Sequence, residues 1–387
     1  MMKTAVVLFA PGFEESEALT VVDILRRGAV DAKAVSVGDP DVTGAHGITL
    51  RADCTLDDLT TLPDLIVLPG GYAAVEALRQ HPRVRTLLCE AAAADRCLAA
   101  LCAAPVVLSD AGLLENRRFT AYPTVAATIS AGHFCAESVV CDGKLVTGMG
   151  PAAVYAFSYA LLEQLGADRA AVESRMVYSH SFDPSRAVPL PNALPAADAE
   201  TRQERIAVLM AEGFEEGETM TIVDLLRRLG FCCDTFYFGA PLVRGMHGMM
   251  LYGDRPFGAD VSAYDVVVLP GGRPGGENLR RNPDVTALLR TMNDMPGKYL
   301  AAMCSGTTVL AAAEVIAGKR MTGYTGYAEK LPGALFSETV AVKDQNLITS
   351  QGPATPYPFA LLIAETLGAN TAWLRARTLY PQVGGIG

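Results

Sequence analysis

The chain has 387 residues, a length that suits two or three domains. Half of the residues are hydrophobic and 19% are charged, a composition typical of folded globular proteins that excludes a disordered chain. The formal net charge is −10 and no basic stripe occurs, so nucleic acid is not expected as a partner. No apolar run approaches the roughly 20 residues of a membrane span, and the first one ends at acidic residues without a signal-peptide cleavage site, so we expect a cytoplasmic protein that does not bind membranes.

An internal duplication is the main feature of the sequence. Residues 10–29 (APGFEESEALTVVDILRRGA) and 211–230 (AEGFEEGETMTIVDLLRRLG) are identical at twelve of twenty positions. Four more blocks recur in the same order: DLIVLPGG and DVVVLPGG, LAALCAAP and LAAMCSGT, FTAYP and MTGYT, LVTGMGPAAVYAF and LITSQGPATPYPF. The repeat is far longer than the roughly 20–50 residues of a solenoid unit. We therefore predict two similar domains, 1–180 and 204–387, joined by a proline-rich linker, 181–203.

Each half is expected to alternate short apolar strands with helices. The expected strands are Ala5–Ala10, Ala32–Val37, 65–69 and 98–101 in the first half, and Ile206–Met210, Cys233–Phe238, 266–270 and 300–303 in the second. An amphipathic helix through VVDILRR or IVDLLRR follows the first strand of each half. A late hairpin across Asp-Gly or Gln-Asn precedes a final helix, Ala152–Gly166 or Thr355–Gly368. This order predicts a mainly parallel sheet with helices on both faces.

Of nine cysteines, only Cys102 and Cys304 occupy matching positions in the two halves. The spacings of the nine cysteines are irregular and include no CxxC pair, so we expect reduced thiols and no metal site. Each of these two cysteines follows a strand and precedes a helix, a sharp turn that lifts the side chain above the sheet edge. The helix beyond it favours a thiolate, so we expect these two thiols to have the lowest pKa values. A single cysteine is more often a small core residue, but the recurrence beside matching turns favours a functional role.

Acidic turns precede the first helix of each half. Glu14, Glu15, Glu215 and Glu216 are explained well as partners of the helix dipole. Glu17 and Glu218 lie one turn further on, where the helix can direct each carboxyl at its cysteine. A carboxyl beside a thiolate in a partly buried site should stay protonated, donate a hydrogen bond and move a proton.

Glycine pairs end the third strand of each half, Gly70-Gly71 and Gly271-Gly272. Without side chains, their amides can approach a substrate closely and stabilise a developing oxyanion. A plain tight turn would also require glycine, so the motif gains weight only beside the cysteine.

Together these motifs resemble the ThiJ/PfpI superfamily of the class I glutamine-amidotransferase-like fold, and within it the branch of the Parkinson-disease-associated deglycase. The resemblance implies two tandem flavodoxin-like α/β sandwich domains. It also implies that Cys102 and Cys304 are the reactive cysteines and that Glu17 and Glu218 are their carboxyl partners. The oxyanion donors it implies are the amides of Gly71, Ala103, Gly272 and Ser305.

Three departures from the family pattern stand out. Members with glyoxalase or deglycase activity commonly have histidine where this chain has Tyr122 and Tyr324, and tyrosine is a poor base at neutral pH. Protease-like members have histidine directly after the cysteine, where this chain has Ala103 and Ser305, so peptidase activity is not expected. The second half has CSGT where the first has CAAP, and we expect the first half to be the more active.

Two further recurring pairs are candidate pocket residues. His46 and His247 recur in GAHGITL and GMHGMML, although such loop histidines are more often polar surface residues. Arg27 and Arg228 resemble an arginine at the family's dimer interface. Because single-domain relatives usually dimerise, we expect the two halves to form an intramolecular pseudo-dimer. Assembly of whole chains into a homo-oligomer is a further alternative.

Two functions from different classes fit these residues. One is a cofactor-independent enzyme acting on small reactive carbonyls, as a glyoxalase III-like hydro-lyase that converts methylglyoxal to lactate, or as a deglycase. The other is a redox-sensing, stress-protective protein whose cysteine is oxidised to sulfinate, with chaperone-like or partner binding. A role in the thiamine pathway rests on the family name alone.

Overall fold

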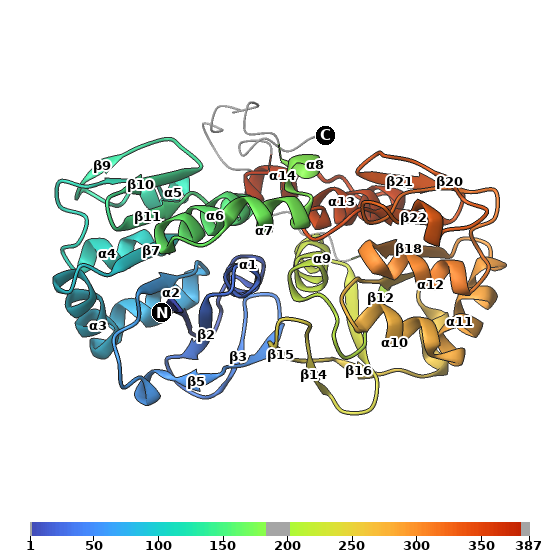
Figure 1. Cartoon of the computed structure of the whole chain (residues 1–387), viewed down its shortest axis with the longest axis horizontal. Coiled ribbons are helices and arrows are strands. Elements are labelled where there is room, and N and C mark those ends of the chain that lie inside the picture. The colour runs from blue at the N-terminus through green and yellow to red at the C-terminus, as the bar shows by residue number, and fades with distance from the viewer. Residues whose placement is uncertain (1, 183–201, 381–387) are drawn as a thin grey trace. The chain divides into compact units, whose positions relative to one another are not determined.

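The computed structural model describes residues 2–182 and 202–380, so most of the expected linker, 183–201, lies outside the described residues. The described chain forms two compact units (Figure 1). The first contains residues 2–173 and 376–380, and the second contains residues 174–182 and 202–375. None of the helices described is both long and apolar enough to cross a membrane.

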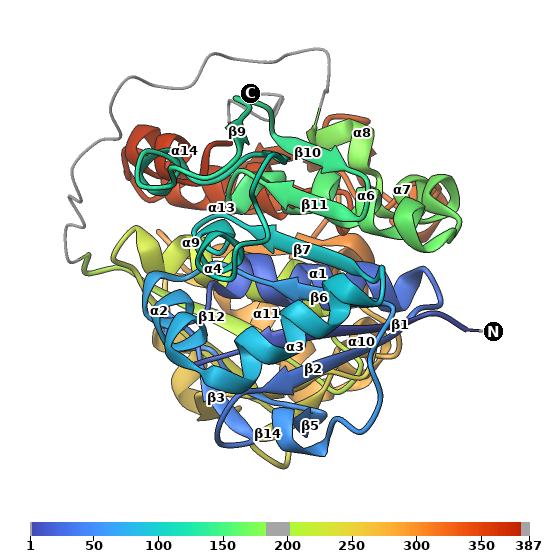
Figure 2. The same cartoon turned by 90° about the vertical axis from the view of Figure 1, so that its left-hand side faces the viewer.

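A seven-stranded sheet forms the centre of the first unit, in the order β10-β11-β7-β6-β1-β2-β5. Its strands are β1 (Thr4–Phe9), β2 (Asp31–Ser36), β5 (Cys54–Thr55), β6 (Leu65–Leu68), β7 (Cys97–Leu101), β10 (Val139–Asp142) and β11 (Leu145–Gly148). All neighbours are parallel except β10 and β11, which form the expected hairpin. Figure 2 shows β7, β6, β1 and β2 side by side. Every residue of β6 and β7 is buried, as expected for central parallel strands covered on both faces.

The second unit repeats this sheet, in the order β16-β13-β12-β17-β18-β22-β21. Its strands are β12 (Arg205–Met210), β13 (Cys232–Tyr237), β16 (Arg255–Pro256), β17 (Val266–Leu269), β18 (Tyr299–Met303), β21 (Ala341–Asp344) and β22 (Leu347–Ser350). Again only the last pair, β21 and β22, is antiparallel. The strands and late hairpins expected from sequence are confirmed in both halves, within one or two residues at their ends.

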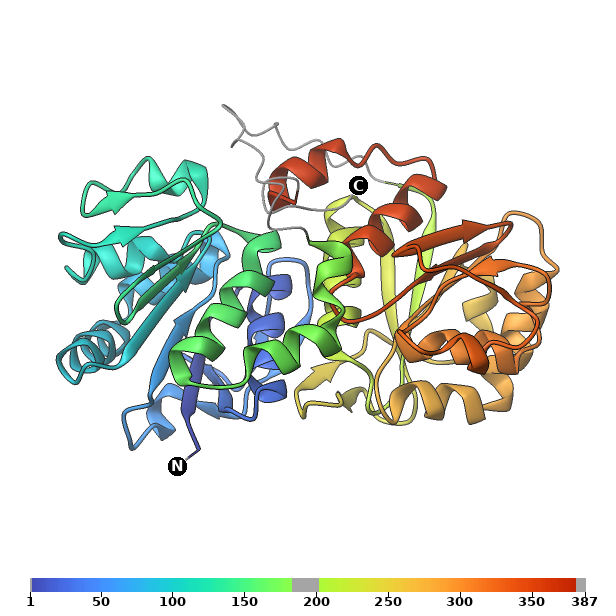
Figure 3. The ribbon, with the colours of Figure 1, turned by 45° about the horizontal axis from the view of Figure 1, so that its top comes forward.

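Helices cover both faces of each sheet. In the first unit, α1 (Glu15–Arg27) and α6 (Val154–Leu165) pack against each other on one face (Figure 3), and α2 (Tyr72–Gln80), α3 (Pro82–Ala93) and α4 (Pro105–Asp110) lie on the other. In the second unit, α9 (Glu216–Arg228) and α13 (Pro356–Thr366) correspond to the first pair, and α10 (Gly275–Arg281), α11 (Pro283–Asn293) and α12 (Thr307–Ala312) to the other three. The expected parallel α/β sandwich, present twice, is confirmed.

Several short elements lack a sequence signal because each is too brief to show a period. They are the strands β3 (Asp41–Thr43), β4 (Thr49–Arg51), β8 (Arg118–Phe119), β9 (His133–Phe134), β14 (Leu242–Arg244), β15 (Met250–Tyr252), β19 (Arg320–Met321) and β20 (Leu335–Phe336), and the helices α5 (Pro123–Ala126), α7 (Arg169–Met176), α8 (Tyr178–Ser181) and α14 (Ala372–Thr378). Single 3₁₀ turns occur at Leu56–Asp58, Pro151–Ala153, Ala259–Ala263, Cys304–Gly306 and Ala328–Lys330.

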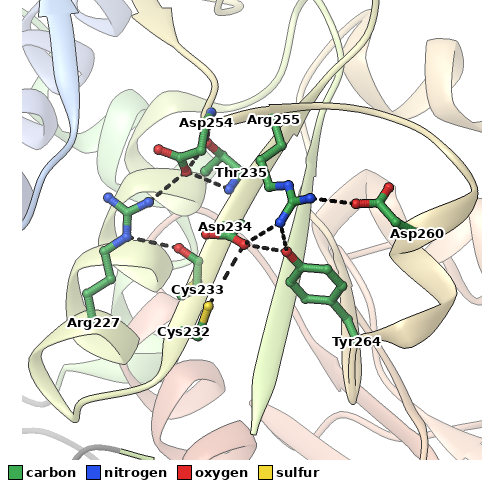
Figure 4. Close-up of polar contacts among 9 residues, drawn as sticks. All are labelled: Arg227, Cys232, Cys233, Asp234, Thr235, Asp254, Arg255, Asp260 and Tyr264. Atoms are coloured by element: carbon green, nitrogen blue, oxygen red, sulfur yellow. Dashed lines mark hydrogen bonds and ion pairs between the residues drawn. The ribbon is translucent and has the colours of Figure 1, made fainter. Parts of the chain in front are cut away.

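A polar network fixes the edge of the second sheet (Figure 4). Arg227 donates to the carbonyl of Cys233 at 2.9 Å and to the Asp254 carboxylate at 2.7 Å. Asp254 in turn accepts from the amide of Thr235 at 2.7 Å. The first unit repeats the arrangement with Arg26 and Asp53. These contacts join the end of the first helix to the second strand of each sheet.

Candidate active site

Cys102 and Cys304 lie in the turns that leave the carboxyl ends of β7 and β18. Their φ angles are 62° and 52°, in the left-handed region that residues other than glycine rarely adopt. The Cys102 amide donates to the carbonyl of Gly148 at 2.9 Å, which ties the turn to the end of β11. Both cysteines are partly exposed. The expected sharp turn is therefore present in both halves, and a strained backbone of this kind occurs often at functional sites.

A buried carboxyl contacts each of these cysteines. Glu17 lies beside the Cys102 thiol and raises its pKa, and Glu218 does the same at Cys304. One oxygen of each carboxyl also accepts the amide of the first glycine in the glycine pair, at 2.8 Å from Gly70 and 2.9 Å from Gly271. Both glutamates are fully buried. The structure thus brings together the cysteine, carboxyl and glycine that the sequence predicted as one site, in each half.

The first glycine of each pair allows this close approach. A Cβ atom at Gly70 would lie 2.5 Å from Glu17 Oε2 and 2.7 Å from Cys102 Cβ. At Gly271 the corresponding distances are 2.6 Å to Glu218 Oε2 and 2.7 Å to Cys304 Cβ. A side chain would therefore have to occupy the space in which thiol and carboxyl meet.

The second glycine of each pair adopts a positive φ, 99° at Gly71 and 110° at Gly272. A Cβ atom at either position would lie 2.3 Å from a backbone oxygen, so glycine is required. The amide of Ala103 acts on the Cys102 sulfur and lowers its pKa, and the amide of Ser305 does the same at Cys304. The amides after the cysteines thus point at the sulfur, where an added substrate oxygen would also lie.

The expectation of a low pKa at these two thiols is corrected by their surroundings. The pKa of the Cys102 thiol is raised well above its ordinary value. Burial is the largest cause, and the charges of Glu17 and Glu14 act in the same direction. Burial and then Glu218 raise the pKa of Cys304 in the same way. The single amide at each sulfur opposes this only partly, and the helix after Cys102 has just six residues. The carboxyl and the thiol therefore compete for one proton in each site, and a thiolate is favoured only when the glutamate is protonated.

Tyr122 and Tyr324 each donate to a distant backbone carbonyl. The Tyr122 hydroxyl donates to Arg377 at 3.0 Å, and the Tyr324 hydroxyl donates to Arg175 at 2.9 Å. Each tyrosine thus fixes a segment that is far away in sequence but belongs to the same compact unit.

These two segments, 174–178 (SRMVY) and 376–380 (ARTLY), were missed by the sequence reasoning. They recur at the repeat offset of 202 residues, which is the signal that could have revealed them. In each, one residue has a positive φ, 53° at Val177 and 59° at Leu379. A Cβ atom at Gly352 would lie 2.6 Å from the Val177 side chain, and one at Gly150 would lie 3.0 Å from Leu379. The segments therefore pack onto the loops that follow β22 and β11.

The recurring histidines contact the first helix of their own half. Glu15 accepts the amide of His46 at 2.6 Å and contacts its ring Nδ1 at 3.0 Å. Glu216 accepts the amide of His247 at 2.8 Å. Both glutamates are fully buried, so reading them only as dipole partners was incomplete: they hold the loop between two short strands.

Arg27 and Arg228 each pair with a buried aspartate one helical turn earlier. Arg27 Nε lies 2.9 Å from Asp23, and Arg228 Nε lies 3.0 Å from Asp224. Their role at an interface between the halves, and the pseudo-dimer itself, stay predictions.

Comparison with known proteins identifies the family. The profile of the DJ-1/PfpI family matches residues 3–164 and again residues 204–366. The chain belongs to the DJ-1/PfpI family. It is a tandem member, because each match covers one complete set of cysteine, carboxyl and glycine pair.

Several relatives of this family member span both halves or one. Protein DJ-1 homolog B from Arabidopsis thaliana is 32% identical over 94% of this chain and 84% of its own length. Protein DJ-1 homolog A from the same plant is 30% identical over 94% of both chains. A single-domain relative from Schizosaccharomyces pombe, named glutathione-independent glyoxalase DJ-1, is 27% identical over 43% of this chain and 92% of its own length.

Solved structures match this DJ-1/PfpI family chain one half at a time. Drosophila melanogaster DJ-1beta is 29% identical with a TM-score of 0.45, covering 46% of this chain and 98% of that one. A mutant DJ-1 superfamily protein from Salmonella typhimurium is 34% identical with a TM-score of 0.44, covering 46% and 97%.

Proposed function

We propose that the chain is a cofactor-independent, cysteine-dependent enzyme that converts small reactive carbonyl compounds, with methylglyoxal as substrate and lactate as product. The observation that carries the proposal is the buried carboxyl that meets each thiol around one glycine, Glu17 with Cys102 and Glu218 with Cys304. The thiol can add to a carbonyl carbon, and the carboxyl can move a proton. The name of the Schizosaccharomyces pombe relative, a glutathione-independent glyoxalase, supports this chemistry.

The first steps form and rearrange a bond to sulfur. Cys102 sulfur adds to the aldehyde carbon of methylglyoxal, and the proton shared with Glu17 goes to the aldehyde oxygen, which gives a hemithioacetal. The Glu17 carboxylate then takes the remaining hydrogen of that carbon as a proton. The electron pair moves toward the neighbouring ketone, whose carbon receives the proton back from Glu17 and whose oxygen takes the proton of the hemithioacetal hydroxyl, so that the former aldehyde carbon becomes a carbonyl. The product of these steps is a thioester of lactate on Cys102.

Water completes the reaction. It adds to the thioester carbon, the sulfur leaves with a proton, and one methylglyoxal and one water have become one lactate. The Ala103 amide, which points at the sulfur, would stabilise the oxygen anion formed when water adds. Release of a carbonyl from a glycated amino group, a deglycase reaction, would begin at the same pair.

Redox sensing is the second candidate, because the same contacts would also stabilise an oxidised sulfur. Two molecules of a peroxide would convert the Cys102 thiol to a sulfinate and release water or alcohol. Glu17 and the Ala103 amide, which both act on the sulfur, would then form hydrogen bonds with the sulfinate oxygens. In that case the cysteine would be consumed once and would not turn over.

Lactate production from methylglyoxal tests the proposal directly. We would compare wild type, Cys102→Ser, Cys304→Ser, the double variant and Cys89→Ser, an exposed cysteine outside both sites. The double variant should lose turnover, Cys89→Ser should keep it, and Cys102→Ser should lose more than Cys304→Ser if the first half is the more active. Absence of lactate from wild type, or full activity of the double variant, would overturn the proposal, and stoichiometric sulfinate formation without turnover would favour the redox function.

A further inference from the structure

A cavity of about 900 Å³ opens beside Cys304 in the second unit. Gly272 and Ser305, the neighbours of the site cysteine in space and sequence, form part of its wall. The rest of the lining comes from three segments of the second unit: Arg273, Pro274, Glu277 and Arg280; Thr308, Ala311 and Ala312; Tyr327, Lys330 and Pro332. The cavity therefore adjoins the Cys304 site through Gly272 and Ser305 and has its own polar wall.

Positive charge dominates this wall. Arg273 donates to the Tyr327 hydroxyl at 3.4 Å, and Lys330 Nζ lies 3.8 Å from the centre of the same ring. Among the described residues, neither cation forms an ion pair with a carboxylate. The one lining carboxylate, Glu277, is bound by Arg280 at 2.6 Å and by Arg281, also at 2.6 Å. Two cations thus remain available to an anion, Arg273 at the hydroxyl and Lys330 at the ring of one tyrosine.

The electrostatics also link Arg273 to the site cysteine. The hydrogen bond with Tyr327 is the main cause that raises the pKa of Arg273, and the charge of Cys304 contributes in the same direction. The charge of the site cysteine therefore acts on a guanidinium that lines the cavity.

The first half provides a natural comparison, because its corresponding residues differ. Tyr72 stands at the position of Arg273, Val125 at that of Tyr327 and Thr128 at that of Lys330. Tyr72 is hydrogen-bonded to Thr124 at 3.1 Å. These three positions, which carry two cations around a ring in the second half, carry no charge in the first.

The remaining arginine is also treated differently in the two halves. Arg79, the counterpart of Arg280, is bound by Glu76 at 3.1 Å and by Asp110 at 2.6 Å. The second half has Ala312 where the first has Asp110. The second half therefore has one acid fewer and two cations more at the corresponding positions, which changes the kind of ligand that the site attracts.

We propose that the cavity beside Cys304 binds carbonyl compounds that carry an anionic group, a carboxylate or a phosphate, and that Arg273 and Lys330 hold this group while the carbonyl carbon faces the cysteine. The carbonyl part rests on the proposed function, and the anion part stands on the cavity itself. The two halves would then divide their substrates by charge, with uncharged carbonyls handled at Cys102.

Alkylation tests the anion part without any turnover. Iodoacetate and iodoacetamide are similar in size and react in the same way, but only the first is an anion. We would measure both rates at Cys304 and Cys102 of the full chain by peptide mapping, so that the thiolate fraction cancels in each ratio. Charge-assisted hydrogen bonds should make the iodoacetate-to-iodoacetamide ratio about tenfold higher at Cys304 than at Cys102.

Substituting the first half's residues supplies the matched variants. Arg273→Tyr and Lys330→Thr should together lower the ratio at Cys304 to that at Cys102, and Arg320→Thr, which removes a positive charge outside the cavity, should leave it unchanged. Equal ratios at the two cysteines of wild type, or an equal effect of Arg320→Thr, would overturn the proposal.

Kinetics then identify the anion and separate this inference from the proposed function. In Cys102→Ser, we would compare methylglyoxal with two charged 2-oxoaldehydes, 4,5-dioxopentanoate for a carboxylate and hydroxypyruvaldehyde phosphate for a phosphate. One of the charged compounds should have a kcat/KM about tenfold above that of methylglyoxal, and Arg273→Tyr should remove the difference. Turnover of methylglyoxal without this preference would overturn the anion proposal alone. A charge-dependent alkylation ratio without any turnover would overturn the carbonyl part and leave the anion site.

Discussion

The hydroxyl of Tyr122 donates to the backbone carbonyl of Arg377 at 3.0 Å, across 255 residues of sequence. In the second half, Tyr324 makes the same bond to Arg175 at 2.9 Å. Tyr122 and Tyr324 thus hold the 376–380 and 174–178 segments in place. Their chemistry is positioning: a donor bonded to a carbonyl is poorly suited to act as a base.

Tyr122→Phe should therefore weaken packing more than chemistry. Loss of the hydroxyl leaves the Arg377 carbonyl without this donor, which should cost about 1 kcal/mol of unfolding free energy. In a Cys304→Ser background, which isolates the first half, methylglyoxal turnover should fall less than tenfold. Denaturant unfolding and lactate production measure both quantities. A loss of a hundredfold or more in kcat at unchanged stability would instead show that the phenol takes part in proton transfer.

Gly70→Ala should separate thiol from carboxyl in the first half. The added Cβ would lie 2.5 Å from Glu17 Oε2 and 2.7 Å from Cys102 Cβ, so one of them must move. We expect a stability loss of about 1–3 kcal/mol, as for other overpacked sites, and loss of first-half turnover. Gly38→Ala is the control, because no atom lies within 4 Å of its Cβ position. Normal turnover of Gly70→Ala in the Cys304→Ser background would show that the close contact is not needed.

The sequence predicted the parts of the site that are local. Strands that end in Gly-Gly or in cysteine, repeated twice, are sufficient to place Cys102, Glu17 and Gly70 at one sheet edge, since the carboxyl ends of parallel strands lie together. The partner of Tyr122 could not be predicted in this way, because a hydrogen bond between side chain and distant carbonyl leaves no periodic pattern.

The cationic cavity escaped prediction for a similar physical reason. Its wall is built from three separate segments, and Arg273, Tyr327 and Lys330 carry no motif within any one of them. The thiol pKa was misjudged because the helix dipole is a local feature that sequence reveals, whereas burial and the charge of Glu17 become visible only in three dimensions.

Cys232 and Cys233 should differ sharply in reactivity although they are adjacent. Cys232 is exposed and Cys233 is buried, and burial raises the pKa of the Cys233 thiol from 9.0 to about 12. Its thiolate should therefore be scarce in the folded chain below about pH 11, so iodoacetamide should label Cys232 and spare Cys233 at pH 8. Peptide mapping measures this, and unfolding in urea should equalise the two.

The same shift has a consequence for stability. In the unfolded chain Cys233 loses its proton near its ordinary pKa, whereas in the folded chain it keeps it until about pH 12. The folded state thus binds more protons between these values, so the contribution of Cys233 is complete below about pH 9 and is lost as the pH rises toward 12. Cys233→Ala should make unfolding less dependent on pH in that range. Rapid labelling of Cys233 at pH 8 would contradict both expectations.

Glu17→Gln and Glu218→Gln test the proton transfer itself. The amide can still accept from the glycine amide that each carboxyl now binds, at 2.8 Å from Gly70 and 2.9 Å from Gly271, so the fold should persist. An amide cannot take the proton from the hemithioacetal carbon, and loss of a positioned acid–base group typically costs about 10²–10⁴-fold. Lactate formation by each variant, in a background where the other half's cysteine is serine, should fall by that factor, while the glutamate-to-aspartate variants should keep part of the rate. If Glu17→Gln turns over methylglyoxal within threefold of its background, the carboxyl does not move the proton, and if only the rate of sulfinate formation changes, the site serves oxidation and not carbonyl conversion.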